Sequence, residues 1–268
     1  MFGVGVGVRV GGFTASSGGG FDPDAQAFFD RVTTAGGTLT TTEKNATNQL
    51  VLDMKSAGIW SAMKAIYPMV GASAAACAQN LKSSSFTGTF SSGWTFASTG
   101  VTGNGTSTFM DNGMTSAANL SLNSAHIAYY SRTNSGATMV MAGTQSLYVL
   151  ARFTNYHANN SVESDLGGIN TGTTSAGFFM SNRTIGTEMK YQINGSIQTD
   201  STTTAATASI QASQSLYMGC QNTALFGVRF YNNFSTAWYS IGDGLTDTQA
   251  SNFYTAVQAF QVTLSRSV

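Results

Sequence analysis

The chain has 268 residues, of which 9% are charged, and its 12 Lys and Arg residues balance 12 Asp and Glu residues. This balance leaves no basic surface to attract nucleic acid or an acidic membrane, so we expect neither as a partner. An aromatic content of 11% excludes a disordered chain, and 30 Gly, 36 Thr and 32 Ser residues disfavour a mainly helical one. The composition predicts short strands joined by turns, with hydroxyl and amide groups on the surface.

Residues 1–20 are predicted to form a docking strand followed by a flexible linker. Val4, Val6, Val8 and Val10 alternate with small or polar residues, as side chains on one face of an extended strand do. A Gly- and Ser-rich segment follows, which is typical of a flexible linker. The pattern predicts a tether that adds a strand to the sheet edge of a partner. The alternative is a first strand in the chain's own sheet.

Other features of the sequence limit its location and redox chemistry. No run of 18 apolar residues is present, so we expect no membrane span. The N-terminus lacks the charged and apolar regions of a secretory signal. Cys77 and Cys220 lie far apart without metal-binding spacing, and we expect two buried, reduced thiols, with a disulfide as the alternative.

Residues 21–72 are predicted to form a small helical unit. Asp22 and Pro23 provide an N-cap and a proline at the first helical position, and residues 40–43 form a capping box for a second helix. An apolar stripe over residues 59–67 predicts a further helical segment. Nine of the 24 charged residues fall in this unit, so we interpret its apolar faces as packing surfaces.

Residues 73–268 are predicted to form a β-sandwich with a C-terminal helix. The C-terminal helix begins at a second capping box over residues 246–249. Asn194 and Gly195 form the strongest hairpin signal in the chain. Short runs with strand character recur without a helical period between them, which indicates two packed sheets. These runs cover residues 124–132, 138–142, 146–153, 176–182, 188–194, 215–219 and 224–231.

Four motifs follow one another in the second half of the chain, at residues 191–195 (YQING), 216–219 (LYMG), 225–231 (LFGVRFY) and 245–247 (LTD). In this order, the segment 147–249 resembles a concanavalin A-like, laminin-G-type jelly roll. The resemblance implies a mainly β fold: a jelly-roll β-sandwich with a small N-terminal helical unit and a C-terminal helix.

A second resemblance concerns the whole arrangement. The helical segment 21–70, the polar sandwich and the ending 241–261 resemble proteins encoded among bacteriophage tail and virion-appendage genes. This resemblance implies a location in the virion, contact with other virion proteins through the N-terminus, and attachment to a host surface. It also implies a homo-oligomer, for which a trimer is the usual symmetry of phage fibres.

The residues that catalysis requires are scarce. His126 and His157 are the two histidines, and we expect His126 to be a structural residue within a strand. The sequence contains no Gly-x-Ser-x-Gly nucleophile motif. Glu163 and Asp165 are interpreted as a solvated pair in a loop, with a cation-binding loop and a catalytic pair as alternatives. We therefore expect the protein to have no enzymatic activity, no metal site and no cofactor.

Glycan binding requires less specialised chemistry. Aromatic faces stack on the C–H surfaces of sugars, and amide, hydroxyl and carboxylate groups supply hydrogen bonds. The candidate residues are Trp94, Tyr156, His157, Asn159, Asn160, Asn232, Asn233 and Trp238. The alternative is a core role for the two tryptophans and a turn role for the asparagines.

The sequence thus favours a non-enzymatic bacteriophage virion appendage that attaches to host-surface glycans. The first alternative is a structural decoration protein of the head or tail. The second is a glycan depolymerase, and the third is a secreted bacterial adhesin, which the missing signal disfavours.

Overall fold

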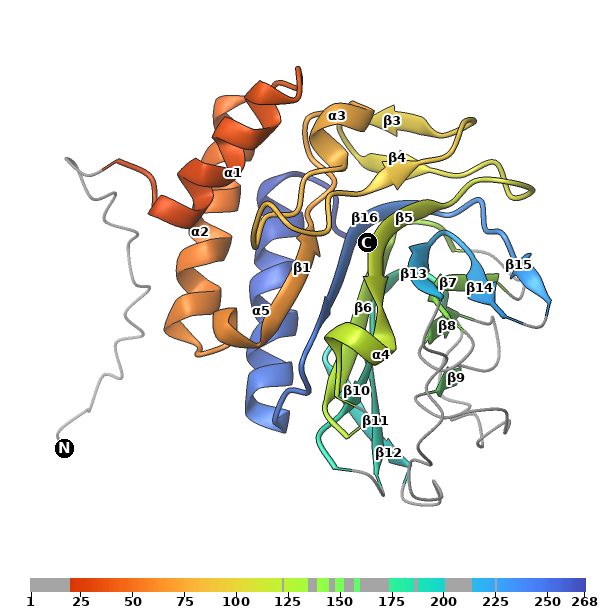
Figure 1. The fold of residues 1–268 in the computed structure, drawn as a ribbon. Coiled ribbons are helices and arrows are strands. Elements are labelled where there is room, and N and C mark those ends of the chain that lie inside the picture. Colours follow the sequence, from red (N-terminus) through yellow and green to blue (C-terminus); the bar gives the residue numbers. More distant parts are fainter. Residues whose placement is uncertain are drawn as a thin grey trace, which may run out of the picture.

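The computed structural model describes residues 20–121, 123–134, 139–144, 148–151, 157–159, 174–185, 188–200, 214–224 and 226–268. These residues form three layers, in which helices cover one face of an eight-stranded sheet and a six-stranded sheet covers the other (Figure 1). A two-stranded hairpin lies beside the six-stranded sheet (Figure 1). None of the described helices is long and apolar enough to span a membrane.

Local capping signals set the starts of the three long helices. Asp22 accepts a hydrogen bond from the Asp24 amide, and both predicted capping boxes form, at Thr40 and at Thr246. The helices predicted to begin at Pro23 and at the capping boxes of residues 40–43 and 246–249 are thereby confirmed. The described helices are α1 (Pro23–Thr34), α2 (Thr41–Ser56), the 3₁₀ turn η1 (Trp60–Ala62), α3 (Ala74–Cys77), α4 (Ser116–Asn119) and α5 (Asp247–Thr263).

The named strands pair antiparallel throughout. The eight-stranded sheet has the order β12-β11-β10-β6-β16-β4-β3, with β1 also on β16, and the six-stranded sheet has the order β2-β5-β13-β7-β8-β9. The first sheet consists of β1 (Met63–Tyr67), β3 (Thr95–Ala97), β4 (Gly100–Thr102), β6 (Ala125–Ser131), β10 (Gly177–Arg183), β11 (Met189–Ile193), β12 (Ser196–Asp200) and β16 (Ser235–Gly242). The second consists of β2 (Thr89–Phe90), β5 (Met110–Thr115), β7 (Met139–Gly143), β8 (Tyr148–Ala151), β9 (His157–Asn159) and β13 (Ser215–Met218).

The eight-stranded sheet is the middle layer. Every residue of β6 and β10 is buried, because both faces of this sheet are covered. In β6, Ile127 and Tyr129 face the six-stranded sheet, whereas Ala128 and Tyr130 face the helices. Alternate residues of the same strand therefore stabilise two separate cores.

The helical core joins α1, α2 and α5 to the middle sheet. Trp238 of β16 packs against Phe253 and Phe260 of α5, and Met63 of β1 belongs to the same cluster. The helices therefore form an outer layer that packs directly on the eight-stranded sheet.

The mainly β, jelly-roll fold class predicted from the sequence is confirmed. The chain passes between the two facing sheets after β1, β2, β4, β5, β6, β9 and β12, and again between β13 and β16, as in a jelly roll. The predicted turn at Asn194 and Gly195 joins β11 to β12, and both residues have the positive φ angles, 46° and 87°, that a type I′ turn requires. Both cysteines are free and buried, as predicted.

The helix predicted over residues 59–67 is wrong. After α2 the chain makes η1 and then β1, which pairs antiparallel with β16. Met63 and Ile66 face the helices while Ala65 and Tyr67 face the other sheet, so the apolar residues serve two cores. The strand forms because β16 supplies backbone partners that the local sequence does not reveal. The division of the chain at residue 72 stays a prediction, although β1 lies before it.

Candidate functional site

The outer face of the six-stranded sheet is the open sheet face of the described structure. Met110 and Met114 of β5 point into the core, so Asp111 between them points outward. On the neighbouring strand β13, Leu216 and Met218 are buried and Tyr217 points outward. Asp111 and Tyr217 are cross-strand partners on this open face.

Tyr217 forms the centre of this face. Its ring stacks on Phe109, with centroids 4.6 Å apart and planes 5° from parallel. On its other side, Gly143 of β7 is the partner in register and contributes no side chain next to the phenol. Partial burial, the charge of the neighbouring Asp111 carboxylate and a hydrogen bond to it raise the pKa of the Tyr217 hydroxyl to about 12, so the hydroxyl stays protonated.

Trp94 lies next to the backbone of Phe109 and packs against the core between the two sheets. Its Nε1 donates to the Phe109 carbonyl at 3.2 Å, and its ring meets Phe90 edge to face at 5.4 Å. A Cβ at Gly219 would lie 2.9 Å from the indole, so glycine there permits the ring to approach the backbone. Trp94 is half-buried and held in place by these contacts.

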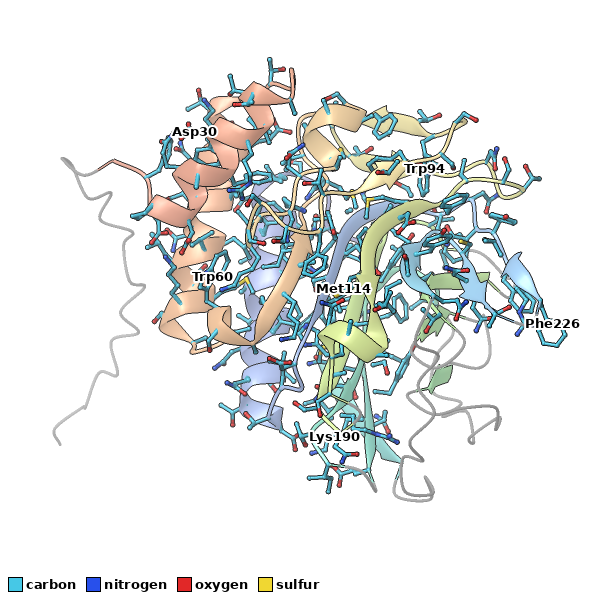
Figure 2. The ribbon with its side chains drawn as sticks, viewed as in Figure 1. Asp30, Trp60, Trp94, Met114, Lys190 and Phe226 are labelled. Atoms are coloured by element: carbon cyan, nitrogen blue, oxygen red, sulfur yellow. The ribbon has the colours of Figure 1, made fainter. Side chains whose placement is uncertain are left out.

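The aromatic face is defined here as the stacked pair Phe109 and Tyr217. Tyr231 follows the small hairpin and lies close enough to Tyr217 to raise the pKa of its hydroxyl. Figure 2 shows Trp94 and Phe226 of the hairpin on the side of the molecule away from α1 and α2.

The hairpin consists of β14 (Gln221–Thr223) and β15 (Gly227–Arg229). The Arg229 cation lies over the rings of Phe226 and Phe230, at 4.8 Å from each centroid. These two rings are 64% and 48% exposed. Phe230 has a φ angle of 55°, a conformation that costs an ordinary residue about 1–3 kcal/mol. The chain therefore presents two aromatic rings and a cation together at the surface.

Hydrogen bonds fix the hairpin to the six-stranded sheet. Asn222 donates to the Ser215 carbonyl at 3.1 Å, and Gln221 donates to the Thr144 carbonyl at 3.3 Å. At its turn, the Thr223 hydroxyl accepts from the Phe226 amide at 3.1 Å. The hairpin and the aromatic face are thus parts of one connected surface.

Of the predicted glycan-binding residues, Trp94 is half-buried against the core between the two sheets, and Trp238 does not reach the surface. Trp238 is fully buried, and its Nε1 donates to the Ser240 hydroxyl at 3.0 Å, so its prediction as a surface residue is wrong. Asn232 is also buried, where its amide donates to the Met141 carbonyl. Its neighbour Asn233 is exposed.

The other predicted binding residues are not tested by side-chain geometry. His157 and Asn159 begin and end β9, of which the structure describes the backbone. Tyr156 and Asn160 lie outside the described residues, as do the docking residues Val4, Val6, Val8 and Val10 and the acidic pair Glu163 and Asp165.

His126 is a structural residue, as predicted. It is fully buried, and its Nδ1 lies 2.6 Å from the Asp243 carbonyl oxygen. Burial lowers its pKa to about 4, so the imidazole is neutral near pH 7. Among the described residues, no group of three or more His, Cys, Asp or Glu side chains could hold a metal ion.

The sequence interpretation missed the stacked pair Phe109 and Tyr217, as well as Arg229 between its two phenylalanines. A signal for the second existed, because Phe226, Arg229 and Phe230 fall within the single strand-like run 224–231. Whether an aromatic residue in such a run faces the core or the solvent depends on strand register, which the run alone does not determine.

No protein-family model matches the chain, and neither does any curated protein. Among solved structures, it is similar to domain 4 of AbnA, a GH43 extracellular arabinanase from Geobacillus stearothermophilus, in complex with arabinotriose. The identity is 12% and the TM-score 0.47, over 72% of this chain and 98% of that one. It is also similar to the botulinum neurotoxin serotype D binding domain, with an identity of 8% and a TM-score of 0.49 over 74% of this chain and 52% of that one. For a Trypanosoma rangeli sialidase, the identity is 8% and the TM-score 0.43, over 79% of this chain and 39% of that one. At these levels of similarity, the activities of those proteins do not transfer to this chain.

Proposed function

We propose that this chain is a non-catalytic glycan-binding protein and that a sugar binds on the aromatic face. The observation that carries the proposal is the Phe109 and Tyr217 stack on an open sheet face, next to the Asp111 carboxylate. Aromatic rings pack against the C–H face of a sugar, while a carboxylate accepts hydrogen bonds from adjacent hydroxyl groups. The Tyr217 hydroxyl is hydrogen-bonded to Asp111 and orients that carboxylate, while the phenol oxygen can accept a hydrogen bond from the sugar.

The composition of this face favours binding over hydrolysis. Glycoside hydrolysis commonly uses two carboxyl groups about 5–9.5 Å apart. Asp111 is the carboxylate that the described outer face provides, and its Oδ1 accepts a hydrogen bond from the Gly113 amide at 2.8 Å. A single, already bonded carboxylate suits recognition.

The finer proposal is that the chain is a bacteriophage virion appendage. It is supported by the resemblance of residues 21–70 and 241–261 to proteins encoded among virion-appendage genes. In this proposal, Val4, Val6, Val8 and Val10 dock onto another virion protein, the chain forms a homo-oligomer such as a trimer, and the aromatic face attaches to a host glycan. Deleting residues 1–20 should then leave a folded protein that binds glycan and no longer joins the particle.

Substitutions on the aromatic face test the binding proposal. We expect the wild-type protein to bind one or more members of a printed array of bacterial and eukaryotic glycans. Tyr217→Ala and Phe109→Ala should each weaken that binding by about tenfold or more, because each removes half of the stack. The matched control is Leu52→Ala on α2, which removes a 42% exposed apolar side chain from the helical layer.

Two results would count against the proposal. One is the absence of any glycan bound by the wild-type protein. The other is binding that both face variants retain in full while their urea unfolding curves match that of the wild type. Release of shortened products from a bound glycan would favour a depolymerase.

A further inference from the structure

The hairpin β14–β15 presents a guanidinium group whose outer donors have no described protein acceptor. Arg229 donates from Nε to the Gln221 side chain at 2.9 Å, which fixes one edge of the group. The rings of Phe226 and Phe230 lie against the cation at 4.8 Å each. Aromatic faces attract a cation but accept no strong hydrogen bond, so the Nη donors remain available to a ligand.

No carboxylate of the described structure neutralises this cation. Residues 221–233 contain no Asp or Glu, and the segment 86–109 that carries Trp94 contains none either. The ion pairs found among the described residues involve other cations, namely Lys55, Lys64 and Lys190. Among the described residues, Arg229 therefore has no carboxylate partner.

The cation is also held in position before any ligand arrives. The bond to Gln221 and the two flanking rings restrict its side chain, and the hairpin itself is bonded to β13 and β7. A fixed planar guanidinium with two free donors matches the two oxygens of a carboxylate. The rings reduce the water around it, which strengthens a charge-assisted hydrogen bond.

We propose that Arg229 binds the carboxylate of an acidic sugar, so that the ligand of the aromatic face is an anionic, carboxylated glycan. This inference rests on the proposed glycan binding and adds its substrate class. Asn222 of the hairpin donates to the carbonyl of Ser215, two residues before Tyr217 on β13, so one acidic oligosaccharide can contact Arg229 and the aromatic face together. The exposed parts of Phe226 and Phe230 contact the apolar face of the acidic sugar ring.

The test compares acidic polysaccharides with their neutral counterparts. Polygalacturonate, alginate, hyaluronate and polysialic acid are each titrated against the full chain, beside the same polymer after chemical reduction of its carboxyl groups to alcohols. We expect at least one acidic polymer to bind about tenfold or more tightly than its reduced form, as a charge-assisted pair predicts. Raising the salt concentration should weaken the acidic interaction and leave the neutral one unchanged.

Substitution of Arg229 provides the second part of the test. Arg229→Gln should lower the affinity for the acidic polymer to that of the reduced polymer, and Arg229→Lys should fall between, because lysine keeps the charge and loses the paired donors. The matched control is Lys44→Gln, which removes one positive charge from α2, where Lys44 lies over the Phe29 ring. Equal urea midpoints for these variants would establish that each one is folded.

Three outcomes would overturn the inference. Equal binding of acidic and reduced polymers, both lost in Tyr217→Ala, would keep glycan binding and reject the acidic class. Arg229-dependent binding to phosphatidylglycerol vesicles, without binding to any polysaccharide, would identify a lipid phosphate as the anion instead. Binding to neither polymers nor vesicles would reject this inference, whereas an array glycan that still bound would leave the proposed function standing.

Discussion

Trp238 of β16 and Phe253 of α5 meet edge to face, with ring centroids 6.0 Å apart and planes at 61°. Both side chains are fully buried. The contact joins the central strand of the middle sheet to the C-terminal helix, so sheet and helix are stabilised together.

Replacing Trp238 with alanine should therefore lower the free energy of unfolding of the protein. Removing a buried aromatic side chain of this size costs about 3–5 kcal/mol, which urea denaturation measures as a lower midpoint. Trp238→Phe keeps part of the packing and should cost less. Loss of glycan binding in a Trp238→Phe protein of wild-type stability would contradict its assignment to the core.

The two capping boxes should make separate, measurable contributions to stability. Thr40→Ala removes the side-chain acceptor at the start of α2, and Thr246→Ala removes the one at the start of α5. Each is expected to lower the free energy of unfolding by about 0.5–2 kcal/mol. Thr41→Ala, at an exposed position of α2, is the control and should change it by less than about 0.5 kcal/mol. Equal effects of Thr40→Ala and Thr41→Ala would show that the cap adds nothing.

His126 should make stability depend on pH. Its pKa is about 4 in the folded protein, because of burial, and about 6.5 in an unfolded chain. Between these values the unfolded chain binds more protons, so this contribution is fully present above about pH 6.5 and decreases as the pH falls toward 4, by on the order of 3 kcal/mol. Urea midpoints at pH 7 and pH 4.5 measure the loss. His126→Asn should show a smaller difference between the two midpoints, and an unchanged difference would assign the pH dependence to other groups.

The two thiols should be unreactive in the folded protein. Burial raises the pKa of Cys77 to about 12 and that of Cys220 well above its ordinary value, so neither forms appreciable thiolate at neutral pH. Titration with a thiol reagent should find no accessible thiol under native conditions and two in denaturant without reductant. A count of none in denaturant would indicate a disulfide.

Local signals in the sequence were sufficient for the long helices and for the β11–β12 turn. Capping boxes and an Asn-Gly pair act over three or four residues, so the sequence alone reveals them. The strand β1 was mistaken for a helix, because its apolar residues fit helical spacing equally well and its partner β16 is remote in sequence. The run STAWYSIG of β16 is rich in small and hydroxyl residues, and its strand is defined by neighbours on both sides.

The candidate site was predictable in its chemistry and less so in its residues. The sequence indicated aromatic rings beside amide and hydroxyl groups, but Trp94 packs against the core and the ring pair of the face is Phe109 and Tyr217. Trp238 was misplaced because its strand is covered on both faces, which follows from how helices and sheets assemble. The Phe109 and Tyr217 stack joins residues from separate strands, and no local pattern contains both.

The pairing of β1 with β16 also sets an order of events during synthesis. Residues 63–67 leave the ribosome long before residues 235–242, and until the latter arrive β1 and β6 both lack the strand that lies between them. An incomplete chain thus exposes two unpaired strand edges, which favour association with other chains. Completion of the middle sheet therefore has to wait for β16, and folding should be slow because the contacts that complete the sheet are distant in sequence.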